Sequence, residues 1–221
     1  MLLSGGLDSA VSLFFAISKG YKCYCLAFDY GQRHKAEIAR AKALARITGS
    51  GFKTEKIVLS WGGSSLLDKK AHLPSDRKPG QIKKSGVPST YVPARNTIFL
   101  SIAASYAEAI GADKIFIGAH FEDSSGYPDC RRSYLEAFDR VIKIGTKRGL
   151  EHHLSLGFPL INMSKKEIIK LGRSLGVPFE HTWSCYRGAA TPCGRCDSCI
   201  LRENGFNQAG ITDPLRDGFN G

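Results

Sequence analysis

The sequence lacks any long hydrophobic run. A helix that crosses a bilayer needs about 20 consecutive apolar residues, whereas the apolar stretches of this 221-residue chain, such as residues 115–117, are far shorter. The first residues also lack the basic start and the apolar stretch of about 7–15 residues that a secretory signal has. We therefore expect no membrane span and a cytoplasmic location.

Acidic residues are scarce relative to basic ones. The chain has 20 Asp and Glu against 31 Lys and Arg, which gives a formal net charge of +11. Residues 181–221 hold four residues of each sign, so the surplus belongs to residues 1–180. Residues 69–95 alone hold seven basic residues and a single acidic one, Asp76. Such a field attracts tRNA, a nucleoside triphosphate or a carboxylate, so charge alone does not identify a partner.

Internal repeats and low-complexity segments are absent as well, and 43% hydrophobic with 23% charged residues is typical of a globular protein. Strand and helix signals alternate along the chain, which predicts an α/β fold with a doubly wound parallel sheet. Only Met1, Leu2 and Leu3 precede Ser4, so we expect either that the first strand is a stub or that the sequence is trimmed at its start. The predicted helices cover residues 9–19, 36–47, 95–110 and 133–144, with one more after Ser164, and the predicted strands cover 21–29, 53–59 and 114–119.

A kinase-type phosphate loop is also missing, but Ser4-Gly5-Gly6-Leu7-Asp8-Ser9 stands where the first strand meets the first helix. Glycines let the backbone approach a phosphate, and the first N–H groups of a helix attract anions. The alternative is a plain helix cap made by Ser4 or Asp8. The full pattern at this junction favours a phosphate-binding loop.

Four of the seven cysteines, Cys185, Cys193, Cys196 and Cys199, fall within 15 residues. Four thiolates form a closed tetrahedral site, which favours structural zinc over a catalytic metal. A redox pair and an iron–sulfur cluster are the alternatives. Cys23 and Cys25 lie two residues apart on a predicted buried strand and are expected in the core.

Other polar residues stand at the ends of predicted strands or at helix starts. Asp29 closes the second strand and Gln32 follows it. Arg95 and Asn96 begin a helix, where an arginine could clamp a phosphate or carboxylate. Residues 125–131 form a polar loop after a strand, in the region where open α/β sheets bind ligands. Simple turn and capping roles are the alternatives, with Asp129 capping the next helix. Nothing in the sequence gives Cys130 a neighbouring base, so a covalent role is not favoured.

The loop at residues 4–9 resembles the pyrophosphate-binding loop of the adenine nucleotide α-hydrolase-like ATP pyrophosphatases. Residues 28–34, 92–96, 125–131 and 182–186, together with the three later cysteines, narrow the resemblance to the 7-cyano-7-deazaguanine synthase family. This resemblance spans essentially the whole chain.

The resemblance implies an ATP-dependent ligase that converts 7-carboxy-7-deazaguanine and ammonia to 7-cyano-7-deazaguanine through adenylated intermediates, in queuosine or deazapurine biosynthesis. It implies Mg²⁺ with ATP, structural zinc, free ammonia, a homodimer and no direct nucleic acid partner. The expected catalytic residues are Asp8, Arg95 and Asp123. The expected cofactor contacts are Leu3, Ser4, Gly5, Gly6, Leu7, Asp8, Ser9, Ala10, Asp29, Gln32, Asn96 and Gly118, and the expected substrate contacts are Asp123, Ser125, Gly126, Tyr127, Asp129 and Arg131.

No regular element is evident between residues 60 and 93, and so long an irregular stretch is usually a functional loop. We therefore predict an ATP-binding α/β domain over residues 1–180, with a mobile basic lid at about 60–93, and a zinc-binding segment over residues 181–221 packed on it. Two alternatives stay open: a related enzyme that thiolates tRNA or forms lysidine on it, and a zinc-stabilised nucleic-acid-binding module. The electrically neutral cysteine segment argues against the first, and steep salt-dependent tRNA binding without AMP formation would favour the second.

Overall fold

The computed structural model describes residues 1–33, 35–59, 61–68, 70–84, 86–120 and 126–216. Strand β1 (Tyr24–Asp29) pairs in parallel with β2 (Gly51–Lys56), and β3 (Lys114–Phe116) pairs in parallel with β4 (Ser155–Gly157). Residues 1–3 lie between these pairs, because Leu3 N–H donates to Leu26 O at 2.9 Å and Leu2 N–H donates to Phe116 O at 2.9 Å. The stub therefore completes a parallel sheet in the order β2, β1, residues 1–3, β3, β4.

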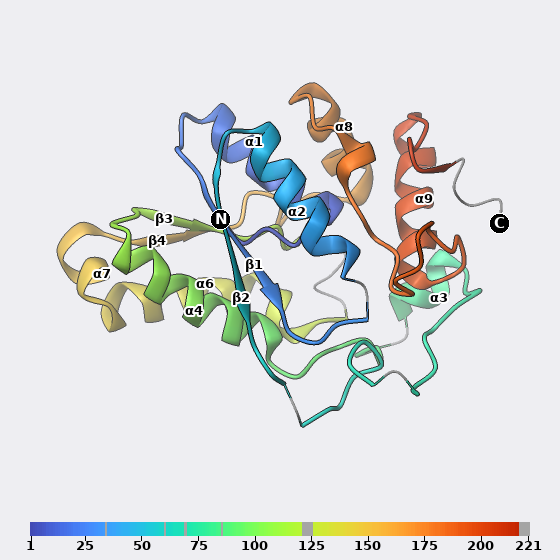
Figure 1. The fold of residues 1–221 in the computed structure, drawn as a ribbon, viewed down its shortest axis with the longest axis horizontal. Coiled ribbons are helices and arrows are strands. Elements are labelled where there is room, and N and C mark those ends of the chain that lie inside the picture. Colours follow the sequence, from blue (N-terminus) through green and yellow to red (C-terminus); the bar gives the residue numbers. More distant parts are fainter. Residues whose placement is uncertain (34, 60, 69, 85, 121–125, 217–221) are drawn as a thin grey trace.

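Side chains of the strands alternate between two cores, as the pleat requires. Leu2, Leu26 and Ile115 point into the core shared with α4 (Arg95–Ala109) and α6 (Arg132–Gly145). Leu3 and Cys25 point into the opposite core. That core is shared with α1 (Leu7–Ser18), α2 (Ala36–Ile47), α8 (Lys165–Ser174) and α9 (Asp197–Ala209). Helices thus cover both faces of the sheet (Figure 1), which confirms the predicted doubly wound α/β fold.

Most predicted elements are confirmed within a few residues. The helix predicted over residues 36–47 is α2, and α8 begins at a capping box in which Ser164 N–H donates to Glu167 Oε2 at 2.8 Å. The strand predicted at 53–59 is shifted, since β2 ends at Lys56, opposite the last residue of β1. The strand predicted at 114–119 ends early, at Phe116. The short turn at Pro128–Cys130 agrees with the simple turn considered for this loop. The sequence did not indicate α7 (Lys147–His152), β4, α9 or the short turn at Phe179–His181.

The region predicted as an irregular lid contains a short helix, α3 (Pro79–Lys84), which is a correction to the prediction. In Figure 1 this helix lies beside α9, and the two helices are in contact. Helix α3 therefore packs on the C-terminal segment.

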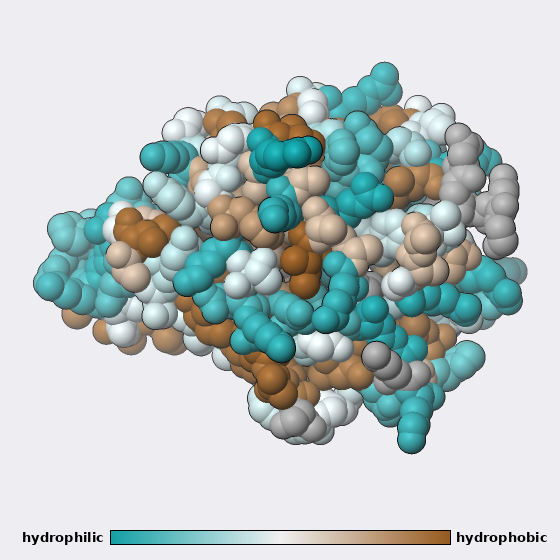
Figure 2. Space-filling view, in the orientation of Figure 1, coloured by the Kyte–Doolittle hydropathy of each residue, from teal (hydrophilic) through white to brown (hydrophobic). Residues whose placement is uncertain are grey.

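Hydrophilic side chains cover most of the molecular face in Figure 2, while apolar surface gathers at the lower edge, over α4 and the chain that leaves β2. Val58, just after β2, is 73% exposed. None of the helices in the described part of the chain has both the length and the apolar character needed to cross a membrane.

Candidate active site

The loop at residues 4–9 is packed so tightly that glycine is required at two points. Gly5 has a φ of +83°, and a Cβ on it would lie 2.2 Å from Glu37 O in α2. Gly118, which follows β3, passes so close to the start of α1 that its Cβ would lie 2.8 Å from Ser9 N. The loop is therefore fixed between α2 and the chain that leaves β3.

Helix α1 begins after Gly6 without a side-chain cap, so the capping role considered for Ser4 or Asp8 is wrong. Ser4 Oγ instead lies 3.0 Å from Ser9 Oγ and accepts from Gly6 N–H at 3.2 Å. An uncapped helix start directly after two glycines leaves N–H groups available for an anion. The geometry therefore matches what a phosphate needs.

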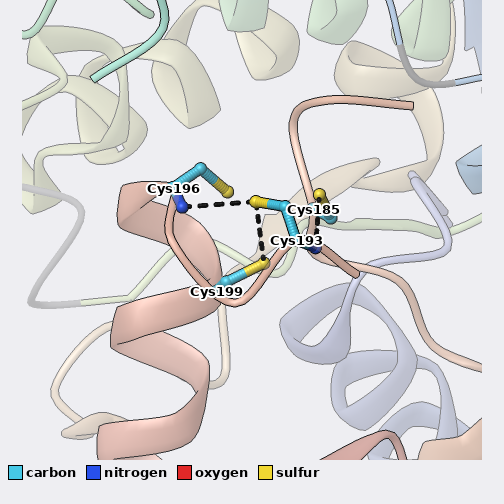
Figure 3. A group of neighbouring side chains, drawn as sticks. All are labelled: Cys185, Cys193, Cys196 and Cys199. Carbon is cyan, nitrogen blue, oxygen red and sulfur yellow. Dashed lines mark hydrogen bonds between the residues drawn. The ribbon is translucent and has the colours of Figure 1, made fainter. Parts of the chain in front are cut away.

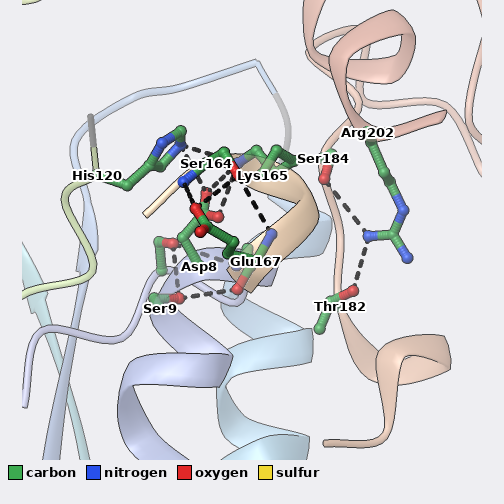
Figure 4. A network of polar contacts seen from close by, with 11 residues as sticks. Asp8, Ser9, His120, Ser164, Lys165, Glu167, Thr182, Ser184 and Arg202 are labelled. Carbon is green, nitrogen blue, oxygen red and sulfur yellow. Dashed lines mark hydrogen bonds and ion pairs between the residues drawn. The ribbon is translucent and has the colours of Figure 1, made fainter. Parts of the chain in front are cut away.

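Asp8 faces a lysine that lies far away in the sequence. Lys165 Nζ, at the first residue of α8, donates to both carboxylate oxygens of Asp8 at 2.7 and 2.8 Å. It also lies 2.9 Å from Nε2 of the buried His120, which must accept this bond because an ammonium can only donate. Figure 4 shows the three side chains converging beside loop 4–9. A carboxylate, an ammonium group and an imidazole nitrogen thus meet at one point.

A cavity of about 320 Å³ opens at this point. It lies at the carboxyl ends of residues 1–3 and β3, where the strand order reverses and where open α/β sheets bind ligands. Its polar side includes Ser4, Ser9 and Lys165, and its apolar side includes Phe28 and Phe99, whose rings stack with centroids 4.0 Å apart. One wall therefore suits phosphates, and the other suits a flat heterocycle.

Arg95 lies in the cavity wall among aromatic side chains. Its Nη1 donates to Tyr30 Oη at 3.2 Å, and its guanidinium carbon lies 5.7 Å from the Tyr30 ring centroid and 5.9 Å from that of Phe99. Burial raises the pKa of the Tyr30 hydroxyl, which stays neutral and does not neutralise the arginine. A guanidinium in this setting is available to a carboxylate or phosphate that enters the cavity.

The structure brings most of the predicted contacts together, but not all. The predicted residues that line the cavity are Leu3, Ser4, Gly6, Leu7, Asp8, Ser9, Gln32, Arg95, Asn96, Gly118, Gly126 and Tyr127. Gly5, Ala10, Asp29, Asp129 and Arg131 do not line it. Gly5 supports the loop from behind, and Arg131 is exposed to solvent. Asp123 and Ser125 lie outside the described residues.

Asp129 has a different role from those considered. Its Oδ2 accepts from the main-chain N–H of Asn96 at 2.9 Å, so it caps the start of α4 and not the helix that follows it. Burial raises the pKa of this carboxyl. Asn96 Nδ2 in turn donates to Cys130 Sγ at 3.1 Å, and Cys130 is buried in the cavity wall. This loop is therefore fastened to the base of α4.

The four cysteines form a compact cluster (Figure 3). Their sulfur atoms all lie within 4.8 Å of one another, and those of Cys193 and Cys199 are 4.0 Å apart. A tetrahedral zinc site with bonds of about 2.3 Å places its sulfurs about 3.8 Å apart, so the cluster has the right size. Main-chain N–H groups of Arg187 and Cys193 point at Cys185 Sγ at 3.4 Å, which stabilises a thiolate. These residues can hold a metal ion.

The thiols of the cluster influence one another. Hydrogen bonds from Cys196 and Cys199 lower the pKa of Cys185. The same interaction raises the pKa of Cys196 to about 12 and raises that of Cys199. Like charges at this spacing disfavour a second thiolate unless a cation is present, so ionisation of all four cysteines would require a bound cation.

A short segment connects the cysteine cluster to loop 4–9. Trp183 N–H donates to Gly5 O at 2.9 Å, and the indole Nε1–H of Trp183 donates to Cys185 O at 3.0 Å. Arg202 fixes the same segment, because it bonds Thr182 Oγ1 at 2.7 Å and forms a buried ion pair with Asp213 at 2.6 Å. The cluster therefore supports the loop through the main chain.

Four residues near the cavity were not predicted as site residues from the sequence: Lys165, His120, Trp183 and Tyr30. Lys165 did carry a signal, because a cation in the first turn of a helix opposes the helix dipole and needs another reason to be there. His120 directly follows the residues predicted as a buried strand, and the argument about strand ends that selected Asp29 would have selected it as well. Trp183 acts largely through its main chain, which leaves no trace in residue type.

This sheet, with an uncapped glycine loop at its first helix and a cavity at the reversal of strand order, defines a nucleotide-binding α/β protein. The architecture agrees with the NMN synthetase structure from Francisella tularensis, which matches with a TM-score of 0.50 at 15% identity over 99% of this chain and 80% of that one. At such low identity the match concerns the fold alone.

The particular family follows from the sequence comparisons. A model described as queuosine biosynthesis protein QueC matches residues 1–210, and the chain belongs to this family. It is 50% identical over 218 residues to a 7-cyano-7-deazaguanine synthase from Trichodesmium erythraeum, covering 97% of this chain and 98% of that protein. It is 48% identical over 216 residues to one from Thermoplasma volcanium, covering 98% of this chain and 89% of that protein.

Proposed function

We propose that this protein is an ATP-dependent nitrile synthase that converts 7-carboxy-7-deazaguanine and ammonia to 7-cyano-7-deazaguanine, in queuosine or deazapurine biosynthesis. The observation that carries the proposal is the cavity, in which an uncapped helix start, Lys165 and Arg95 face a stacked aromatic wall. The match to the QueC family over residues 1–210 narrows the substrate to a deazapurine carboxylate.

The chemistry must replace two carboxylate oxygens by one nitrogen. An oxygen of the carboxylate attacks the α-phosphorus of ATP, pyrophosphate leaves, and ammonia displaces AMP to form the amide with loss of a proton. The amide oxygen is then adenylated by a second ATP, and loss of AMP and a proton leaves the nitrile. One site can perform both activations, since each is the same attack of oxygen on phosphorus.

The residues of the cavity suit this sequence. The N–H groups after Gly6 and the Lys165 ammonium would hold the leaving pyrophosphate, which carries the developing charge. Arg95 would clamp the carboxylate while the ring lies against Phe28 and Phe99. Mg²⁺ with ATP would neutralise phosphate charge, and Asp8 is the residue of this chain suited to hold it, because Mg²⁺ prefers carboxylate oxygens. The substrate contacts expected of Asp123 and Ser125 stay predictions.

We further propose that the cysteine cluster holds structural zinc, because four sulfur ligands leave no position for water. A cytoplasmic location and free ammonia as the nitrogen source belong to the same proposal. So does a homodimer, supported by exposed apolar side chains on neighbouring helices, of which Ile144 is 74% and Leu150 67% exposed. Light scattering on the purified protein tests the dimer, and a monomeric mass would contradict it.

The decisive experiment uses 7-carboxy-7-deazaguanine labelled with ¹⁸O in the carboxylate, together with ATP, Mg²⁺ and ammonium. We expect the nitrile and two AMP per nitrile, each AMP carrying one ¹⁸O, because both oxygens depart on phosphorus. Lys165→Met should stop the reaction, whereas the exposed neighbour Lys166→Met should not. A folded, metal-loaded protein that forms neither amide nor nitrile would refute the proposal. Salt-dependent tRNA binding in its place would support the nucleic-acid alternatives.

A further inference from the structure

Residues 73–82, here called the strap, form part of one wall of the cavity. The strap begins at Leu73, which is buried in the core beneath α4, and it ends in α3, where Ile82 lines the cavity. The next part of the chain continues this wall, since Thr90 also lines the cavity and its Oγ1 lies 2.7 Å from Tyr127 Oη. The strap therefore contributes to the cavity wall through Ile82.

The middle of the strap is fastened to the cysteine cluster. Ser75 forms an antiparallel β-bridge with Cys196, and Asp76 N–H donates to Arg195 O at 2.8 Å. Asp76 adopts the left-handed conformation, with a φ of +60°. This conformation is unfavourable for a residue with a side chain and persists only where the surroundings hold it. The contact with residues 195–196 is therefore a specific one.

Two ion pairs cross at this contact. Arg195 Nε and Nη2 bind the two carboxylate oxygens of Asp76 at 2.8 and 2.9 Å, but both side chains are more than half exposed. Arg77 binds Asp197 in the same two-pronged manner, with Nε 3.0 Å from Oδ1 and Nη2 on Oδ2. The Arg77 side chain is only 27% exposed and that of Asp197 only 7%. Water screens the Arg77–Asp197 pair less than the Arg195–Asp76 pair. Loss of the Arg77–Asp197 pair should therefore weaken the contact more, because it leaves a buried charge without its partner.

Asp197 connects three parts of the site. It is the first residue of α9, it follows the cluster residue Cys196, and it lines the cavity. Its bond to Arg77 therefore sets the distance between the strap and the cysteine segment, which also supports loop 4–9 through Trp183. One segment thereby holds both walls of the cavity.

We propose that Arg77 and Asp197 are positioning residues whose ion pair holds the strap against the cysteine segment, so that the cavity is closed over ATP and the carboxylate. The identity of the bound substrates in this inference rests on the proposed function. The clamp, meaning the Arg77–Asp197 ion pair that holds the strap, does not depend on it. The pair affects the binding of ATP and the carboxylate. Without it, the strap moves away, the cavity widens and water enters, while loop 4–9 and Lys165 stay in place.

Charge reversal tests the clamp. Arg77→Asp and Asp197→Arg should each raise the KM of the carboxylate about tenfold or more while kcat changes less than about threefold, the signature of lost binding. The double variant restores opposite charges and should recover most of the loss. Arg77→Gln, which leaves the cluster untouched, covers the case in which Asp197→Arg fails to fold. The matched control is Arg132→Asp, which reverses an exposed arginine paired with Glu136 at 3.3 Å on α6.

Two readouts do not depend on the reaction. Amide hydrogen exchange of residues 73–82 should become at least about tenfold faster in Arg77→Asp and stay unchanged in Arg132→Asp, and the metal content should stay that of the parent protein. If no nitrile forms with the parent protein, faster exchange would still support the clamp. Unchanged exchange in Arg77→Asp and Arg77→Gln, or no recovery in a folded double variant, would overturn it.

Discussion

The main-chain N–H of Trp183 donates a hydrogen bond of 2.9 Å to the carbonyl oxygen of Gly5. Through this bond the cysteine cluster reaches the glycine loop without contacting the nucleotide site itself. A residue whose side chain is 2% exposed thus connects two motifs that lie at opposite ends of the chain.

Metal removal should therefore weaken ATP binding. We expect a chelator, or Cys193→Ser, to raise the Kd of ATP about tenfold, equivalent to about 1.4 kcal/mol, because Trp183 then no longer holds Gly5. Trp61→Phe leaves Trp183 as the single tryptophan, since the chain has two, and its fluorescence reports the change. Cys23→Ala is the control, because Cys23 lies in the core away from the cluster. An unchanged Kd after complete metal removal would contradict this link.

Gly118→Ala should displace the start of α1, because its Cβ would lie 2.8 Å from Ser9 N and 2.9 Å from Asp8 O, atoms that cannot give way cheaply. We expect ATP binding to fall beyond calorimetric detection, with destabilisation of about 1–3 kcal/mol from overpacking. Gly145→Ala, at the end of α6 with nothing within 4 Å, should be neutral or slightly stabilising. Equal behaviour of the two variants would show that the close approach does not matter.

Lys165→Met should lower kcat about 10²-fold or more, because it removes a donor aimed at the site of developing charge. Thermal stability without nucleotide should fall little, since a cation in the first turn of α8 opposes the helix dipole. Steady-state kinetics and a melting curve on the same preparation measure both effects. Lys166→Met is the matched control. A large loss of stability with normal kcat would assign Lys165 a structural role only.

Arg202→Met should destabilise the protein by about 3–5 kcal/mol, because it leaves Asp213 buried without its partner. Both side chains are 3% exposed, and Arg202 also bonds Thr182 beside the cysteine cluster. Urea unfolding measures the loss. Lys143→Met, which breaks the exposed pair with Asp139, should cost less than about 1 kcal/mol. A small effect of Arg202→Met would mean that the pair does not hold the segment.

Helices and turns that are marked by local signals, such as capping residues and glycines, could be predicted from the sequence. The cap formed by Ser164 and Glu167 marks α8, and the glycines mark the turn into α1. Helix α9 escaped prediction because its apolar residues do not form one stripe. It packs instead through Gly205, where a Cβ would lie 2.4 Å from Lys165 Cγ. Strand β4 spans three residues, Ser155–Gly157, too few to show a period.

The residues of the candidate site also fall into two groups: those that belong to local sequence motifs and those brought together by the packing of distant segments. Loop 4–9 and the four cysteines are local patterns, and both were predicted as motifs. The pairing of Asp8 with Lys165, and of Arg77 with Asp197, depends on how distant helices pack, which no local spacing encodes. Asp129 has a role that its position in a polar loop did not indicate: its Oδ2 accepts a hydrogen bond from Asn96 N–H at the start of α4, while its predicted substrate contact stays a prediction.

The placement of residues 1–3 in the middle of the sheet affects the order of folding. Residues 1–3 must wait for β3 before they have a neighbour on both sides, because Leu2 bonds Phe116. Such distant contacts are slow to form. Gly118, which packs closely against residues 8 and 9 of the loop, follows β3 in the same distant part of the chain. A nascent chain therefore carries its nucleotide loop long before it can shape the loop, and affinity for ATP arises as one of the last events of folding.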